Sequence, residues 1–249
     1  PSKATEVMAM DRLSNGVLVL RRGLWSRSAV PGVRVRKEKT RKIDGREWRN
    51  WSPRHSKLAA GIIRTKLDSS KLLPSEGSQA LYLGAGHGTT VSHLHDHMCG
   101  LGNEHKGSII AVDISPRCMR DLVGLAKLRP GLLPVLADVR NHESLLPWLN
   151  GRVSWMFQDV SQAGQVEIFL NAAKKFLAPG GVALLSLKSA SERIAEGGAN
   201  EHYDSAARAM ETAGLDVLEI IHLKGLEEQH ALISSIAPVD WPLTSEARD

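Results

Sequence analysis

The stretch LYLGAGHGTT, residues 81–90, has the residue types of a loop that binds a nucleotide-containing cofactor. Its glycines stand at 84, 86 and 88, directly behind a short apolar run. Glycines let the backbone approach a ligand closely, and the start of a following helix offers free N–H groups to it. The dinucleotide fingerprint G-x-G-x-x-G would need a glycine at position 89, which is Thr89, so a nucleotide-dependent oxidoreductase is disfavoured.

Three aspartates extend this pattern along the chain. Asp113 ends IIAVD, Asp138 ends LAD, and Asp159 follows VSWMFQ. Asp113 stands where an acidic side chain can accept hydrogen bonds from both ribose hydroxyls of an adenosine. Any one of the three could instead cap a helix, but that explanation fits all three together poorly. The succession predicts one crevice shared by several strand ends.

A largely parallel sheet is needed to bring these residues together. From residue 53 onward, apolar runs alternate with helical stretches, which predicts an α/β fold with a doubly wound sheet. The expected strands are QALYLGA, GSIIAVDIS, LLPVLAD, VSWMFQDV, GGVALLSLKS and a terminal hairpin-like pair, LDVLEIIHL and HALISSIAP. The expected helices are SPRHSKLAAGIIRTKL, PRCMRDLVGLAKL and AGQVEIFLNAAKKFLAP.

Residues 1–52 are expected to form a small basic β-rich domain, with residues 53–249 as the main domain. Runs such as GVLVLRR and GVRVRKEKT alternate with turn residues and favour short hairpins. Residues 1–66 hold 17 Lys or Arg against 5 Asp or Glu, about +12, whereas the remainder has 15 against 22, about −7. This asymmetry favours a polyanionic partner, RNA or DNA first, because clustered cations release counterions from phosphates. The alternative is a solvated basic arm without a fixed partner.

Histidines follow the glycine loop closely. His93 and His97 lie four residues apart on the expected helix, with Asp96 and Cys99 nearby, and such a group could bind zinc. A second ligand pair with the usual zinc spacing is missing from the sequence. We therefore expect no metal and interpret these histidines, His95 included, as polar helix residues.

Six motifs occur along the chain in a specific order: EWRNWSPRHSKLAAGI, YLGAGHGTTVSHL, AVDISPRCMRDL, FQDVSQAGQ, LLSLKS and EEQHALI. In order and spacing they resemble the fibrillarin family, especially its archaeal form, over nearly the whole chain. The combination of GTTVSH, SPR.MR and DV.Q is not a general methyltransferase signature. The resemblance implies a Rossmann-like class I S-adenosylmethionine-dependent methyltransferase sheet.

The function implied by the resemblance is 2′-O-methylation of ribosomal and transfer RNA by the catalytic subunit of a box C/D guide ribonucleoprotein. The implied partners are the guide RNA with its target RNA, a Nop-domain scaffold protein and a kink-turn-binding protein of ribosomal type. The positions that match the family's cofactor contacts are Gly84, Ala85, Gly86, Gly88, Thr89, Thr90, Asp113, Ile114, Asp138, Val139, Asp159 and Gln162. The family's Lys-Asp-Lys-His catalytic set falls on Lys57, Asp159, Lys188 and His230.

Some positions depart from the family pattern. Gly86 and His87 stand where two small residues are usual, and Asp113 stands where Glu is common. EEQHA replaces the more usual EKDHA and leaves the histidine in place. The first two departures are expected to affect cofactor affinity.

A ribose 2′-hydroxyl is a weak acid, so methyl transfer benefits from a base or a positive field at the developing alkoxide. Our hypothesis is that Lys188 with Asp159 lowers the hydroxyl pKa, while Lys57 and His230 orient the target nucleotide. A lysine is more often a solvated surface charge and a histidine a satisfied core residue. Lys188, however, ends an apolar strand, where a charge without a function is costly. The residues do not distinguish which group accepts the proton.

Phosphate contacts are expected from the basic residues Arg34, Arg36, Lys37, Lys39, Arg41, Lys42, Arg46, Arg49 and Arg54, the last three near the cleft. With 4% aromatic residues the chain has little means of reading bases, so specificity is expected from guide pairing. Trp48 and Trp51 are expected in the core. Two other functions stay open: guide-independent methylation of RNA or of a protein glutamine, and a non-catalytic scaffold.

The sequence also bears on location. No apolar run reaches the 18 or so residues of a membrane-spanning helix, and no signal segment or glycine/arginine-rich tail is found. We expect a cytoplasmic protein without a membrane partner.

Overall fold

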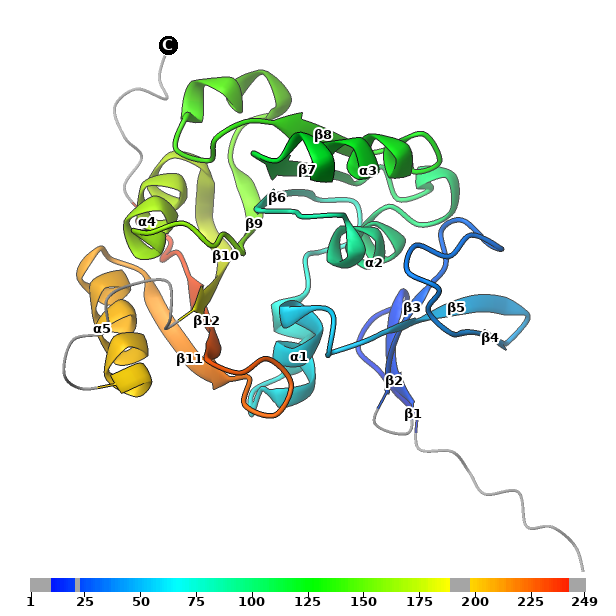
Figure 1. Cartoon of the computed structure of the whole chain (residues 1–249), viewed down its shortest axis with the longest axis horizontal. Helices are drawn as coiled ribbons and strands as arrows, with labels where there is room; N and C mark the ends of the chain where they lie inside the picture. The colour runs from blue at the N-terminus through cyan, green and yellow to red at the C-terminus, as the bar shows by residue number, and fades with distance from the viewer. Residues whose placement is uncertain (1–9, 21–22, 189–197, 242–249) are drawn as a thin grey trace, which may run out of the picture.

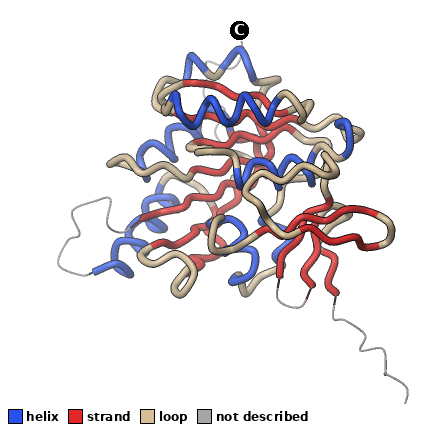
Figure 2. The backbone as a smooth tube through the Cα atoms, turned by 45° about the vertical axis from the view of Figure 1, so that its right-hand side comes forward, coloured by secondary structure: helices blue, strands red, loops and turns tan. Residues whose placement is uncertain are grey.

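The computed structural model describes residues 10–20, 23–188 and 198–241 of the 249-residue chain. Two sheets organise these residues, a seven-stranded sheet and a smaller five-stranded sheet beside it (Figure 1, Figure 2). Within the described residues, no helix combines the length and apolar character needed to span a membrane.

The large sheet has the strand order β11-β12-β10-β9-β6-β7-β8, in which β12 alone runs antiparallel to its two neighbours, β10 and β11. This confirms the predicted doubly wound sheet and its terminal strand pair. Its strands are β6 (Gln79–Leu83), β7 (Ser108–Asp113), β8 (Leu132–Leu136), β9 (Val153–Gln158), β10 (Leu177–Lys188), β11 (Asp216–His222) and β12 (His230–Ile236).

Helices cover both faces of this sheet (Figure 1). The helices are α1 (Lys57–Arg64), α2 (Thr89–Met98), α3 (Pro116–Ala126), α4 (Gln165–Phe176) and α5 (Gly198–Thr212), and short 3-10 turns lie at η1 (Ser69–Leu72), η2 (Leu101–Asn103), η3 (His142–Ser144) and η4 (Leu146–Trp148). Side chains of α1, α2 and α3 share one buried cluster with alternate strand residues, and those of α4 and α5 share another with the remaining ones. Apolar runs buried on both sides are typical of parallel sheets.

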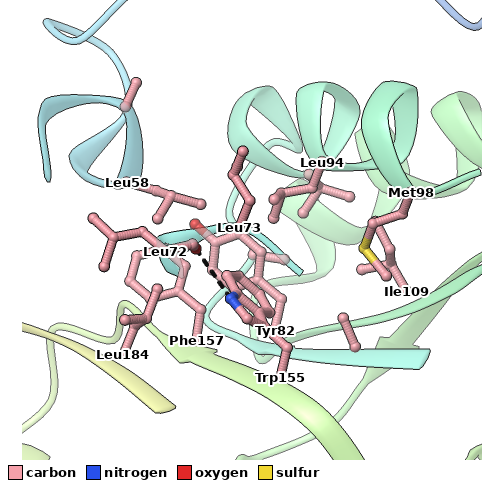
Figure 3. Close-up of a cluster of buried hydrophobic side chains, with 14 of the residues drawn as sticks. Leu58, Leu72, Leu73, Tyr82, Leu94, Met98, Ile109, Trp155, Phe157 and Leu184 are labelled. Atoms are coloured by element: carbon pink, nitrogen blue, oxygen red, sulfur yellow. Dashed lines mark hydrogen bonds between the residues drawn. The ribbon is translucent and has the colours of Figure 1, made fainter. Parts of the chain in front are cut away.

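The cluster beneath α1 and α2 is continuous from helix to sheet. Leu58 of α1 and Leu94 of α2 pack over Tyr82, Phe157 and Trp155 of the strands (Figure 3). The Trp155 Nε1–H donates to the carbonyl oxygen of Leu72 at 3.1 Å, so this large side chain is buried without an unpaired donor.

Helix α1 is shorter than predicted. It ends at Arg64, whereas the sequence pattern carried it to Leu67, which is exposed. Thr65 takes an extended conformation, its hydroxyl donates to Glu219, and the Lys66 N–H also donates to that carboxylate. Tertiary hydrogen bonds to β11 therefore replace the next helical turn.

The small sheet is antiparallel, in the order β1-β2-β3-β5-β4, as expected for hairpins. Its strands are β1 (Met10–Arg12), β2 (Val17–Leu20), β3 (Gly23–Arg27), β4 (Thr40–Ile43) and β5 (Arg46–Trp51). Trp48 and Trp51 are buried, as predicted. Since Trp51 shares a buried cluster with α1 and α2, the division at residue 52 stays a prediction about domains.

The run GVRVRKEKT is not the predicted strand, because β4 begins only at its last residue, Thr40. The Glu38 carboxylate accepts hydrogen bonds from the backbone N–H groups of Val35 and Arg36, at 3.1 and 2.7 Å. Lys37 has a φ of 56°, a left-handed conformation that does not continue a strand. The acidic residue inside the basic run thus folds it into a loop.

A buried ionic network joins the small sheet to α2. The Asp96 carboxylate is fully buried and accepts from Arg49 at 2.6 Å, Arg129 at 2.7 Å, Ser26 at 2.9 Å and the Ala29 N–H at 3.0 Å. Burial raises the pKa of Asp96, but the two guanidinium groups outweigh it and the pKa falls to about 2. Arg49 is therefore no phosphate contact: its side chain is fully buried between Asp96 and Glu38.

The histidines of α2 belong to this buried region rather than to a polar surface. His93, His95 and His97 are each at most 2% exposed. His93 contacts the Ser26 hydroxyl, while His95 and His97 reach the carbonyl oxygens of Pro130 and Pro74. Burial, the largest cause, lowers the pKa of His93 to about 3 and that of His95 to about 4.

These neutral histidines predict that acid destabilises the fold well above the range where carboxylates titrate. Below the ordinary histidine pKa of 6.5, the unfolded chain binds protons that folded His93 and His95 refuse, so stability is full above pH 6.5 and is lost as pH falls. From pH 7 to pH 5 the free energy of unfolding should drop by roughly 2 kcal/mol for each histidine. Urea unfolding at both values measures this.

The matched variants are His93→Gln and His55→Gln, the second at an exposed side chain. His93→Gln should remove the roughly 2 kcal/mol that His93 contributes between the two pH values, and His55→Gln should leave the pH dependence intact. A wild-type unfolding free energy that is the same at pH 7 and pH 5 would contradict the assignment.

Candidate active site

The predicted strand ends meet at one edge of the large sheet. Leu83 of β6 pairs in register with Val112 of β7 on one side and Gln158 of β9 on the other. The next residues along these three strands are Gly84, Asp113 and Asp159, so they lie side by side. A cleft of about 590 Å³ opens at this edge, within the size range of ligand pockets.

Most of the predicted site residues line this cleft. All four proposed catalytic residues line it: Lys57, Asp159, Lys188 and His230. Ten of the twelve proposed cofactor residues also line it: Gly84, Ala85, Gly86, Thr89, Thr90, Asp113, Ile114, Val139, Gln162 and again Asp159. The two that do not are Gly88 and Asp138.

The glycine loop is shaped by close packing. A Cβ on Gly84 would clash with the carbonyl oxygen of Asp159, and one on Gly88 would clash with a methyl group of Leu125. Both residues also have positive φ, 82° and 84°. Gly88 therefore serves the strand-to-helix turn, while Gly86, with open space where a Cβ would lie, borders the cleft.

Asp113 fixes the loop against the next strand. Its Oδ2 accepts from the Gly86 N–H and its Oδ1 from the Ser115 N–H, both at 2.8 Å. A carboxylate has about four acceptor sites, so each oxygen retains capacity for a ligand hydroxyl. Together with the start of α2 at Thr89, this donor set fits the sugar of an adenosine-containing cofactor.

Asp138 is held outside the cleft. Arg140 binds its carboxylate with both Nε, at 3.0 Å, and Nη2, at 2.6 Å. The adjacent Val139 lines the cleft instead. In this arrangement the Asp138 side chain is paired with Arg140 and does not line the cleft, and its predicted contact with the adenine stays a prediction.

The ion pair at the centre of the cleft differs from our hypothesis. Asp159 binds Lys57, not Lys188, with the ammonium 2.9 and 3.0 Å from its two oxygens. Ser56 positions Lys57: it caps α1 through the Ala59 N–H, accepts from Trp51 Nε1 at 3.0 Å and lies 2.9 Å from the Thr90 hydroxyl. The helix start therefore fixes Lys57 over the end of β9.

Lys188 and His230 face the same cleft from the neighbouring antiparallel pair. They are direct partners in the β10 and β12 register, which places their side chains on one face. The Nδ1 of His230 lies 2.9 Å from the carbonyl oxygen of Glu228, an acceptor only, so Nδ1 carries the hydrogen and Nε2 the lone pair. Burial, with the Lys57 charge nearby, lowers the pKa of His230, which keeps the ring neutral at neutral pH.

Sequence reasoning missed several residues of the cleft. Buried Gln165 links two strand ends: its amide nitrogen contacts the Val160 carbonyl, and its oxygen accepts from the Lys188 N–H at 3.2 Å. The Tyr82 phenol also lines the cleft, and burial, with Asp159 nearby, raises its pKa well above the ordinary value, so it stays protonated. Both lie inside regular elements, but Tyr82 begins the motif YLGAGHGTTVSHL and Gln165 ends FQDVSQAGQ, and their place in these motifs is the signal that could have found them.

His87, the departure in the glycine loop, also lines the cleft. Its Nδ1 lies 2.6 Å from an Asp121 carboxylate oxygen on α3.

The described part of the chain holds no group of three or more histidine, cysteine, aspartate or glutamate side chains that could bind a metal ion.

Comparison with known proteins identifies the family of this chain. The family model described as Fibrillarin matches residues 11–238. The fibrillarin-like rRNA/tRNA 2′-O-methyltransferase of Methanopyrus kandleri is 35% identical over 202 residues, 81% of this chain and 82% of that protein.

Solved structures of fibrillarins are similar to the chain over most of its length. Aeropyrum pernix fibrillarin with natively bound S-adenosyl-L-methionine superposes with a TM-score of 0.77 and 30% identity, covering 93% of this chain and 100% of that one. The structure of a fibrillarin/Nop5p complex gives a TM-score of 0.74 and 29% identity, covering 88% and 96%. The chain has the methyltransferase fold of these proteins, and its sequence and structure together show that it belongs to the fibrillarin family.

Proposed function

We propose that this chain is an S-adenosylmethionine-dependent methyltransferase that modifies ribose 2′-hydroxyls of ribosomal and transfer RNA. The observation that carries the proposal is the placement of Lys57, Asp159, Lys188 and His230 around the same cleft that Asp113 and the glycine loop border. The names of the relatives, rRNA/tRNA 2′-O-methyltransferases, support the reaction and the substrate.

The cofactor half of the cleft would hold the adenosine and the amino-acid part of S-adenosylmethionine. Asp113 would accept from the ribose hydroxyls, Val139 and Ile114 would contact the adenine, and the backbone at Gly84, Ala85, Gly86 and Thr89, with Thr90, Asp159 and Gln162, would border the rest. When bound, the cofactor supplies an electrophilic methyl group on a positively charged sulfur.

The catalytic half would raise the nucleophilicity of the 2′-hydroxyl. The charges of Lys57 and Asp159, 2.9 Å apart, neutralise each other, and His230 is neutral. The four catalytic residues therefore carry one net positive charge, which is the ammonium of Lys188. A positive field stabilises the oxygen as its proton leaves. Asp159 and the Nε2 lone pair of His230 are the groups here that can accept that proton.

The assembly is proposed as a box C/D guide ribonucleoprotein. The fibrillarin/Nop5p complex supports a Nop-domain scaffold as partner of this chain. The concentration of positive charge in residues 1–66 and the 4% aromatic content favour a subunit that binds phosphates while a guide RNA selects the target. A kink-turn-binding protein of ribosomal type would complete the complex by holding the guide RNA.

Cofactor affinity tests the assignment of Asp113. Asp113→Ala removes a carboxylate that should bind two ribose hydroxyls, and charge-assisted hydrogen bonds of this kind contribute enough to predict a loss of roughly 10- to 100-fold in affinity. Asp138→Ala, which removes a carboxylate paired with Arg140, is the matched control and should stay within about 3-fold of wild type. Calorimetric titration with S-adenosylmethionine measures both, and the reverse order of the two effects would refute the assignment.

Turnover tests the catalytic cluster. Lys188→Ala should lower the methylation rate of the assembled complex by roughly 100-fold or more, because the excess positive charge at the alkoxide is removed. Cofactor affinity should remain that of wild type. The control is Lys66→Ala, at an exposed lysine outside the cleft. Wild-type turnover by Lys188→Ala would remove that residue from the mechanism.

A further inference from the structure

A second groove, of about 530 Å³, continues the active-site cleft toward the small sheet. The two share His55 and Thr89 as lining residues. We call it the basic groove, and its walls carry Arg36, Lys37, Lys39 and Arg41. His55 is two residues from Lys57. A strand-like ligand that left the catalytic cluster on this side would therefore enter the basic groove directly.

The charge of the basic groove is unbalanced. Among its described lining residues the acidic one is Glu38, and the buried guanidinium of Arg49 lies 2.7 Å from that carboxylate. Burial raises the pKa of Glu38, but hydrogen bonds from the backbone and the charge of Arg49 lower it to about 2. The charges of Arg36, Lys37, Lys39 and Arg41 are therefore not balanced by a carboxylate among the described lining residues of the groove.

The loop that carries these cations is held in place. Glu38 binds the backbone of Val35 and Arg36, and the Lys39 carbonyl accepts from the Asn50 N–H at 2.8 Å. Lys37 has positive φ, which costs about 1–2 kcal/mol for a residue with a Cβ. The Arg41 guanidinium lies 5.4 Å from the ring centre of Trp25, and this contact fixes the orientation of the guanidinium as well. Fixed cations lose less entropy on binding than mobile ones.

A second hollow on the small sheet shows the contrast. It has about the same volume, 540 Å³, and is lined by Arg12, Arg27 and Arg46. Arg12 is paired with Asp44 at 3.0 Å and Arg27 with Glu104 at 2.9 Å. This hollow is therefore nearly charge-balanced. Because Arg46 lines it and not the active-site cleft, the prediction that placed Arg46 near the cleft is wrong.

The geometry points to the basic groove as the seat of the RNA strand that flanks the methylated nucleotide, with Arg36, Lys37, Lys39 and Arg41 on its phosphates. This inference rests on the proposed function and adds the path of the substrate to it. The contacts are to phosphates, so they position the strand without reading its sequence. The direction of the path is set by its start at His55 and Thr89, the edge shared with the active site.

Salt-dependent binding tests the path. The full-length chain is titrated with a single-stranded RNA oligonucleotide by fluorescence anisotropy over a range of salt concentrations. Lys37→Glu/Lys39→Glu should weaken binding at least tenfold and lower the slope of log affinity against log salt by about 0.7 for every phosphate that the variant no longer neutralises. The matched control is Lys71→Glu/Lys127→Glu, which makes the same charge change at two exposed lysines that line neither the active-site cleft nor the basic groove.

The outcomes separate the path from the proposed function. Equal RNA affinity for the two double variants, with wild type binding RNA, would overturn the path alone. Failure of the isolated wild type to bind RNA would also overturn the path, whereas the proposed function, in which scaffold and guide RNA bring the target, is tested separately by methylation in the assembled complex. Loss of scaffold binding by Lys37→Glu/Lys39→Glu with unchanged RNA affinity would make the groove a protein interface and also overturn the path.

Kinetics of the assembled complex give a second readout. If the groove positions the flanking strand, Lys37→Glu/Lys39→Glu should raise the KM for target RNA and leave the affinity for S-adenosylmethionine at the wild-type value. A misfolded variant would lose both. An unchanged KM for RNA would contradict the path.

Discussion

The buried carboxylate of Asp96 is the constraint on which the arrangement of this molecule depends. It is fully buried and is satisfied by Arg49 from the small sheet, by Arg129 from beyond α3, and by a hydroxyl and a backbone N–H. Removing one partner from such a network leaves an uncompensated charge, which is far more costly than the loss of a surface pair. Asp96 lies on α2, and the other end of α2 borders the cofactor cleft. The network therefore holds the small sheet in a fixed position relative to the active-site cleft. It also fixes the loop that Arg49 contacts through Glu38.

Fixed charges also organise the cleft. Lys57 and Asp159 come from segments 102 residues apart and neutralise each other, while Gln165 connects the end of β9 with Lys188. Burial keeps His230 neutral. One cation, Lys188, is left in excess where an alkoxide would form, and a chain of further cations continues from the cleft edge through the basic groove. On the proposed path the two sheets would act on the same RNA: the small sheet would position its phosphate backbone, while the large sheet would position the ribose and the cofactor.

Much of this could be predicted from the sequence, and the failures have physical reasons. Strands and their shared edge followed from apolar runs ending in Gly84, Asp113 and Asp159, because parallel strands impose that geometry. The sequence pattern did not predict which side chains pair with each other. Arg49 and Asp138 have the residue types of ligand contacts, but an ion pair with Asp96 and one with Arg140 engage them. The choice of Lys57 over Lys188 as partner of Asp159 depends on where helix α1 begins, which Ser56 decides through tertiary contacts. Likewise, Glu38 turns a run with strand character into a loop.

The catalytic cluster is proposed to transfer a methyl group to a ribose 2′-oxygen, and the most direct measurement varies that oxygen alone. The complex assembled with scaffold protein and guide RNA is supplied with radiolabelled S-adenosylmethionine and two target RNAs. The two targets are identical except that one carries a 2′-deoxy residue at the guided position. We expect label in the ribose target and none above background in the 2′-deoxy target. Equal label in both RNAs, or label on a protein side chain in the absence of RNA, would contradict the proposed reaction.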